Sequence, residues 1–137
     1  LVCIGNHDER VQRLTATAGI PAMYLKDYQD LYDTPTWEWD YSYLIDDVMY
    51  IHGTGHSGQR PAYNAAIKLG HSVVMGHIHS VGAVQVLQSP TQRIFGMNVG
   101  SGVDKDHRAM DYAKNHLNKP VISAGIVIDG KPIYEIM

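Results

Sequence analysis

Short apolar runs, each followed by glycine or polar residues, recur along the chain and predict a set of β-strands. Single runs of this kind cover residues 1–4, 72–75, 84–87 and 93–99. Two longer runs, residues 41–52 and 122–136, are each divided by a pair of turn-forming residues, Asp46-Asp47 and Asp129-Gly130. Because such pairs favour two-residue turns, we expect both runs to form β-hairpins.

Two segments have the spacing and the end signals of helices. Residues 8–18 place Val11 and Leu14 three positions apart, with acidic residues first and Gly19 after the end. Residues 61–69 start with proline and stop before Gly70. Residues 22–40 show no clean period and are expected to form an irregular surface segment, and one short helix is expected within residues 104–119. The pattern predicts an α/β fold.

Composition narrows the class of protein. The chain has 137 residues, which is the length of one domain, and its 45% apolar and 18% charged residues are typical of a globular protein. A net charge of -3 does not favour nucleic-acid binding. Neither a membrane span nor a signal peptide is indicated, and Cys3 is the single cysteine, so we expect a cytoplasmic protein.

Residues suited to metal binding follow three of the apolar runs. Asn6-His7-Asp8 follows residues 1–4, His52 follows residues 48–51, and His77-Ile78-His79 follows residues 73–75. Binding sites in open α/β sheets collect at the carboxyl ends of strands, where loops converge. Imidazole suits zinc, iron, nickel and copper, and an amide oxygen suits harder cations such as manganese. The pattern therefore indicates a metal site.

Gly5-Asn6-His7-Asp8, Ile51-His52-Gly53 and Gly76-His77-Ile78-His79, in that order, resemble the later motifs of the calcineurin-like metallophosphoesterases. The resemblance implies layers of mixed β-sheet flanked by helices, in a four-layer sandwich with a two-metal centre at the strand ends. The family's early Asp-x-His and Gly-Asp motifs do not occur in this sequence. Residues 1–137 are therefore expected to be a single domain, the C-terminal part of a metallophosphoesterase domain.

The resemblance also implies a role for each motif residue. Asn6, His52 and His77 would bind the second metal and His79 would face the first, while His7 would lie beside the substrate phosphate with Asp8 orienting its ring. The complete site would hold two divalent cations (manganese, zinc, iron or nickel), and this chain alone would hold one. His56 and Arg60, in the glycine-rich loop of residues 53–60, are candidates for contacting the phosphate.

The leading hypothesis is hydrolysis of a phosphomonoester or a phosphodiester. The alternative is a degenerate member of the family that acts as a scaffold or binding protein without turnover. Each motif also has a structural interpretation: helix capping for residues 6–8, a buried histidine for His52, and a polar turn for residues 77–79. Sheet edges left by the absent early motifs would need to pair or be covered, so a homo-oligomer is also expected.

Overall fold

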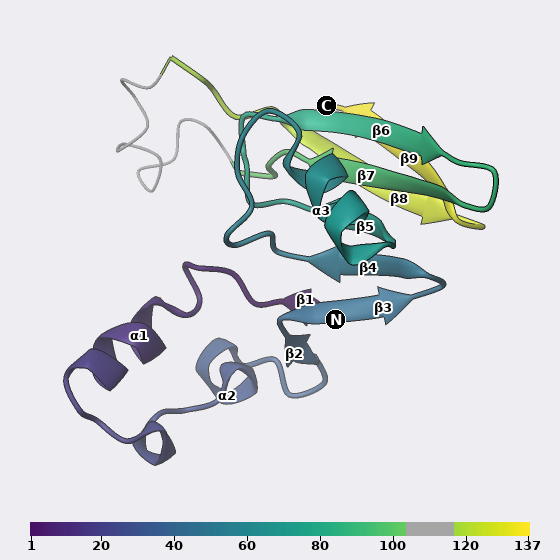
Figure 1. The fold of residues 1–137 in the computed structure, drawn as a ribbon. Helices are drawn as coiled ribbons and strands as arrows, with labels where there is room; N and C mark the ends of the chain where they lie inside the picture. The colour runs from purple at the N-terminus through teal and green to yellow at the C-terminus, as the bar shows by residue number, and fades with distance from the viewer. Residues whose placement is uncertain (104–116) are drawn as a thin grey trace.

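The computed structural model describes residues 1–103 and 117–137. These residues form a mixed α/β structure, which confirms the predicted class (Figure 1). Most of the segment expected to contain a short helix, residues 104–119, lies outside the described residues.

A five-stranded mixed sheet forms the centre of the fold. Its strands, in spatial order, are β3 (Ser42–Ile45), β4 (Val48–Ile51), β5 (Ser72–Met75), β7 (Arg93–Val99) and β6 (Gly82–Gln88). The three central strands, β4, β5 and β7, run parallel, whereas β3 and β6 are antiparallel to their neighbours at the two edges. Since β4, β5 and β7 point the same way, the segments that follow them leave from one edge of the sheet.

The two faces of the sheet are covered by different elements. Helix α3 (Pro61–Leu69) covers one face, and the hairpin of β8 (Ser123–Ile128) and β9 (Lys131–Ile136) packs on the other. The alternation of side chains along β5 separates two clusters, because Val73 and Met75 contact the helix side while Val74 contacts the hairpin side. Both clusters consist of residues that are far apart in the sequence, so the core joins all of these elements.

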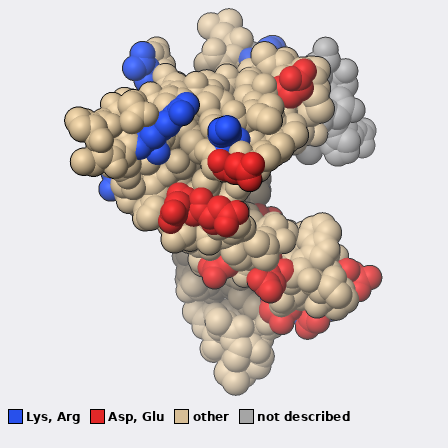
Figure 2. All heavy atoms as spheres, turned by 90° about the vertical axis from the view of Figure 1, so that its right-hand side faces the viewer, with Lys and Arg blue, Asp and Glu red and all other residues tan. Residues whose placement is uncertain are grey.

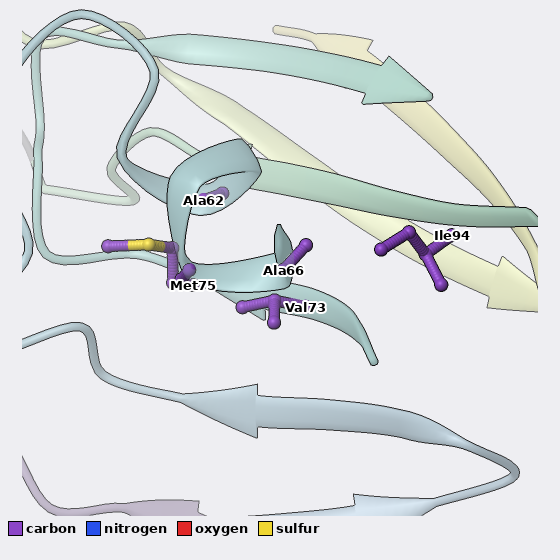
Figure 3. Close-up of a cluster of buried hydrophobic side chains, with 6 residues drawn as sticks. Ala62, Ala66, Val73, Met75 and Ile94 are labelled. Atoms are coloured by element: carbon purple, nitrogen blue, oxygen red, sulfur yellow. The ribbon is translucent and has the colours of Figure 1, made fainter. Parts of the chain in front are cut away.

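Helix α3 lies very close to the sheet. Its buried residues are Pro61, Ala62, Ala65 and Ala66. The three alanines pack with Val73, Met75 and Ile94 (Figure 3). A Cβ atom at Gly96 of β7 would lie 2.3 Å from the backbone nitrogen of Tyr63. The sheet therefore presents only a hydrogen atom to the helix at this point, which fixes the position of α3 on the strands.

The predicted turns of this region and the predicted bounds of α3, β5 and β7 are confirmed, whereas β6 is longer than the predicted residues 84–87. Asp46 and Asp47 adopt φ angles of 50° and 61°, and Asp129 and Gly130 adopt 49° and 69°, so both hairpin turns use the left-handed backbone that these residue types tolerate. Helix α3 and strand β5 have the predicted bounds, and Gly70 ends α3 with φ of 71°. Local sequence signals suffice here because each turn is specified by its own residues.

The N-terminal region contains more regular structure than predicted. It comprises β1 (Val2–Cys3), α1 (Arg10–Thr17), the 3-10 helix η1 (Ala22–Tyr24), α2 (Tyr28–Tyr32) and β2 (Trp39–Asp40). The expectation of an irregular segment over residues 22–40 is therefore wrong in part. Asp27 accepts a hydrogen bond from the backbone of Asp30 and starts α2, and Trp39 stacks on Tyr28 and Tyr32 at centroid distances of 5.3 and 5.0 Å.

Helix α1 forms where it was predicted, but its apolar side chains do not pack into a core. None of its residues is buried, and Val11 and Leu14 are 54% and 61% exposed. Strand β2 instead connects the region to the chain start, since it pairs in parallel with β1 through Val2–Trp39 and Cys3–Asp40. The N-terminal region thus depends on strand pairing and aromatic stacking more than on buried apolar side chains.

Candidate functional site

Two of the candidate histidines lie together because of the register between β4 and β5. Ile51 is paired with Met75, so His52 and the segment beginning at Gly76 leave the sheet side by side. The carbonyl oxygen of His52 accepts hydrogen bonds from the backbone nitrogens of Gly76 and His77, at 3.3 and 2.9 Å. The expected convergence at the strand ends is therefore present for these two residues.

The side chains of Asn6, His52 and His77 meet at one point. His52 Nε2 lies 3.0 Å from Asn6 Oδ1 and 3.0 Å from His77 Nδ1. The two rings have centroids 5.0 Å apart and are inclined by 63°, which directs ring nitrogens rather than ring faces toward each other. The segment after β1 and the ends of β4 and β5 thus each contribute one polar side chain to the same group.

Two glycines make this close approach possible. A Cβ atom at Gly5 would lie 2.7 Å from the ring of His52, so only glycine lets the first segment pass beneath the imidazole. Gly53 has φ of 104°, and a Cβ atom there would lie 2.2 Å from Met75 Cε and 3.1 Å from His77 Cβ. The chain after His52 can therefore turn away without displacing His77.

The histidines of the site favour their neutral forms. Burial is the largest cause of a lowered pKa for His52, His77 and His79, because it disfavours the charged imidazolium. The neighbouring histidines lower these pKa values further, and the charge of Asp8 partly offsets the effect on the pKa of His52. Neutral imidazoles are the form that binds metal ions.

The residue types of this set suit a cation, and two of its three pairs of atoms lie 3.0 Å apart, which is also the length of an ordinary hydrogen bond. Two donors each about 2.1 Å from a metal ion, at right angles to each other, lie about 3.0 Å apart, and both contacts of His52 Nε2 have this length. The three donors are two imidazoles and one amide. Within residues 1–103 and 117–137, no group of three or more His, Cys, Asp or Glu side chains is placed to hold a metal ion.

His79 lies near this group, on the short turn that follows His77. Its charge contributes to the lowered pKa values of His52 and His77, and its backbone oxygen accepts a hydrogen bond of 2.8 Å from Val121. The turn is also bound by Asn98, whose Nδ2 donates to the backbone oxygen of Ile78 at 2.9 Å and to that of Val81. Asn98 did not emerge from the sequence, although an Asn inside the apolar run of residues 93–99 is a signal that could have identified it.

His7 and Asp8 lie on the first segment but have different surroundings. His7 is exposed and borders a cavity with Asn6, Arg10 and Arg13. Asp8 Oδ2 accepts a hydrogen bond from the backbone of Gly5 at 2.9 Å, and Tyr32 approaches its Oδ1 at 3.4 Å. The contacts that the structure gives for the Asp8 carboxylate thus stabilise the segment that carries Asn6 and His7.

The two residues from the glycine-rich loop are separated. His56 and His52 both line a cavity of about 340 Å³, which also includes Ile4, Glu9, Tyr41 and Met49. Arg60 is exposed at the start of α3, and the lining residues of this cavity do not include it. His56 also contributes to the lowered pKa of His77. The structure therefore brings His56 near the candidate site and leaves Arg60 at the surface.

Charged side chains are unevenly distributed on one face of the molecule. Figure 2 shows one face of the molecule, on which Lys and Arg side chains lie mainly in the upper part and most acidic side chains lie in the middle and lower parts. The basic side chains of this face do not form a continuous surface for a nucleic-acid backbone. In the described part of the chain, no helix is long and apolar enough to cross a membrane.

The geometric centre of the candidate site is the contact of Asn6, His52 and His77, with His7, His56 and His79 around it. Comparison of the chain with models of protein families, with curated proteins and with solved structures gave no match.

Proposed function

We propose that this protein is a metal-dependent phosphoester hydrolase of the calcineurin-like metallophosphoesterase type. The observation that carries the proposal is the convergence of Asn6, His52 and His77, three motif residues from separate segments, within hydrogen-bond distance. The structural interpretations of the three motifs (helix capping, a buried histidine and a polar turn) do not require this convergence. Each of them could hold with the three side chains far apart. The order of the three motifs adds independent support.

In this proposal each group has one task. Asn6 Oδ1, His52 Nε2 and His77 Nδ1 hold a divalent cation, with His79 beside them. A bound cation of this kind polarises a phosphoryl oxygen and lowers the pKa of coordinated water. His7 is exposed next to Asn6, where it can reach a bound phosphoester and protonate the leaving oxygen. Asp8 positions His7 through its hydrogen bond to the backbone of Gly5.

The test combines metal binding with turnover. We expect the chain to bind Mn²⁺ or Zn²⁺ in calorimetry and to hydrolyse p-nitrophenyl phosphate or its diester, and we expect His77→Ala to weaken both by tenfold or more. His71→Ala is the matched control, because His71 is partly buried like His77 but lies before β5, at the opposite end of that strand. Turnover that survives both His77→Ala and EDTA would overturn the proposal.

A second candidate function is a binding scaffold that holds one structural cation and has no turnover. It is favoured by the donor chemistry, since the Asn6, His52 and His77 group contains no carboxylate to offset the repulsion between two adjacent dications. Metal stoichiometry separates the two functions. A single bound metal without hydrolysis supports the scaffold, whereas two metals with hydrolysis support the enzyme.

A further inference from the structure

We infer that Asn98 is a positioning residue of the candidate site, whose side-chain amide sets the conformation of the turn that carries His77 and His79. Asn98 lies near the end of β7, opposite Met75 of β5 in the parallel register. It therefore stands beside the point at which the chain leaves β5 toward His77. The inference concerns the same site as the proposed function and specifies which residue outside the metal-binding group determines its geometry.

The amide of Asn98 closes the turn from the inside. Its Nδ2 donates to the backbone oxygen of Ile78 at 2.9 Å and also to that of Val81. The backbone nitrogen of Val81 donates to the same Ile78 oxygen at 3.3 Å. Because Nδ2 has two hydrogen atoms, one for each carbonyl, it joins the two ends of the turn around His79 and Ser80.

The backbone of the turn and of the segment before it makes further hydrogen bonds. The carbonyl oxygen of His52 fixes its beginning through the nitrogens of Gly76 and His77, and Val121 donates to the carbonyl oxygen of His79 at 2.8 Å. These contacts attach the turn to β4 and to the segment before β8. Asn98 adds the side-chain contact that ties the middle and the end of the turn to β7. Three neighbouring segments thus determine where His77 and His79 lie.

The chemistry of Asn98 also indicates a role in the site rather than in core packing. Its side chain is 1% exposed, and its Oδ1 is buried without a hydrogen-bond partner among the described residues. An apolar residue of similar volume would fill the position without an unpaired oxygen. The two donated hydrogen bonds therefore provide the reason for an amide here, and both of them end on the histidine-bearing turn.

The experiment compares Asn98→Ala with Ser72→Ala in the full chain. Ser72 is the matched control, because it is also buried, and its Oγ accepts a hydrogen bond of 3.2 Å from the backbone of Phe95 in the same strand pair, at the opposite end. Amide hydrogen exchange and the ¹H–¹⁵N shifts of the histidine rings are recorded on metal-free protein, and Zn²⁺ and Mn²⁺ affinities are measured by calorimetry.

We expect Asn98→Ala to abolish slow exchange at His77 and Val81, to shift the ring signals of His77 and His79, and to weaken metal binding about 10- to 100-fold. Ser72→Ala should lower the melting temperature and leave all three readouts of the turn unchanged. If Asn98→Ala does not fold, Asn98→Leu, which keeps the volume and removes the unpaired oxygen, is expected to show the same loss at the turn.

The two proposals fail in different ways. If the wild-type chain binds no metal, the proposed function fails, while exchange and ring shifts still decide the role of Asn98. If metal binds but the folded Asn98 variant keeps the wild-type exchange, ring shifts and affinity, the inference is overturned, while the proposed function is still decided by turnover of the wild-type chain. Equal effects of the Asn98 and Ser72 variants on the turn would also overturn it, because they would show a general loss of stability.

Discussion

The central sheet and the N-terminal region are built from similar elements but are stabilised to very different extents. In the sheet, residues such as Val73, Met75 and Met97 are at most 1% exposed, and both faces are covered. In the region of residues 10–32, none of the three helices contains a buried residue. The same apolar residue types therefore contribute a core in one region and an exposed surface in the other.

The candidate site lies across this division. His52 and His77 follow strands whose positions are determined by the core, whereas Asn6 belongs to the segment between β1 and α1. Two residues of the site thus follow strands of the buried core, whereas Asn6 lies between the buried Ile4-Gly5 pair and α1, which has no buried residue. Local opening of the N-terminal region would remove Asn6, His7 and Asp8 while leaving the two histidines in place.

The largest expected effect is a difference in the free energy of unfolding between substitutions at two methionines. Met97→Ala should lower the free energy of unfolding by about 2–5 kcal/mol, because Met97 is 0% exposed and its removal leaves a cavity. Met23→Ala, at a residue that is 82% exposed in η1, should change it by less than about 0.5 kcal/mol. Urea unfolding of both variants measures the contrast, and equal losses would contradict the division into two regions.

A smaller effect is expected where the two regions meet. In Gly5→Ala the new methyl group would lie 2.7 Å from the His52 ring, so the first segment must move away from the histidines. We expect a loss of about 1–3 kcal/mol in the free energy of unfolding, together with weaker metal binding. Gly102→Ala is the control, since no atom of the described residues lies within 4 Å of its Cβ position. A Gly5 variant with the stability and metal affinity of the wild type would contradict this account.

The smallest effect is a dependence of stability on pH in metal-free protein. Burial lowers the pKa values of His52, His77 and His79 below the ordinary 6.5, so the unfolded chain takes up protons that the folded chain does not. Stability is therefore fully present above pH 6.5 and decreases as the pH falls toward the folded-state pKa values. Because the rings are partly solvated, the loss should stay below about 1.4 kcal/mol per pH unit for each histidine.

The pH effect can be assigned by comparing wild-type chain with His79→Gln in urea titrations between pH 7.5 and 5.5. Glutamine does not titrate, so this variant should show a shallower decrease in stability than the wild type over that range. If the dependence of stability on pH is unchanged by the substitution, His79 does not contribute to it. The pKa of His79 would then not be lowered in the folded chain.

Features specified by neighbouring residues could be predicted from the sequence. The turns at Asp46-Asp47 and Asp129-Gly130, the bounds of α3 and β5, and the hairpin pairings all depend on residues within a few positions of each other. The meeting of His52 and His77 could be predicted because each follows an apolar run and the carboxyl ends of parallel strands meet at one edge, whereas β1, which precedes Asn6, lies outside this sheet.

Features that depend on distant partners could not be predicted. Strand β2 exists because Trp39 and Asp40 pair with β1, and a two-residue strand has no period of its own. Helix α1 has an apolar spacing, but the described structure leaves Val11 and Leu14 exposed. The role of Asn98 depends on carbonyl groups 17 and 20 positions away in the sequence. The sequence shows only a polar residue within an apolar strand and does not show which groups its amide contacts.

The parallel register of β4 and β5 has a consequence for how this protein could be re-engineered. His52 and His77 are adjacent because Ile51 pairs with Met75, 24 positions later in the sequence. The pairing of the strands, and not the chain between them, therefore brings the two rings together. The tip of the intervening loop has open space at Gly55 and Gly58. Foreign peptides inserted at this tip would therefore be displayed beside an intact histidine pair, whereas a single residue inserted in β5 would put Gly76 in the place of His77.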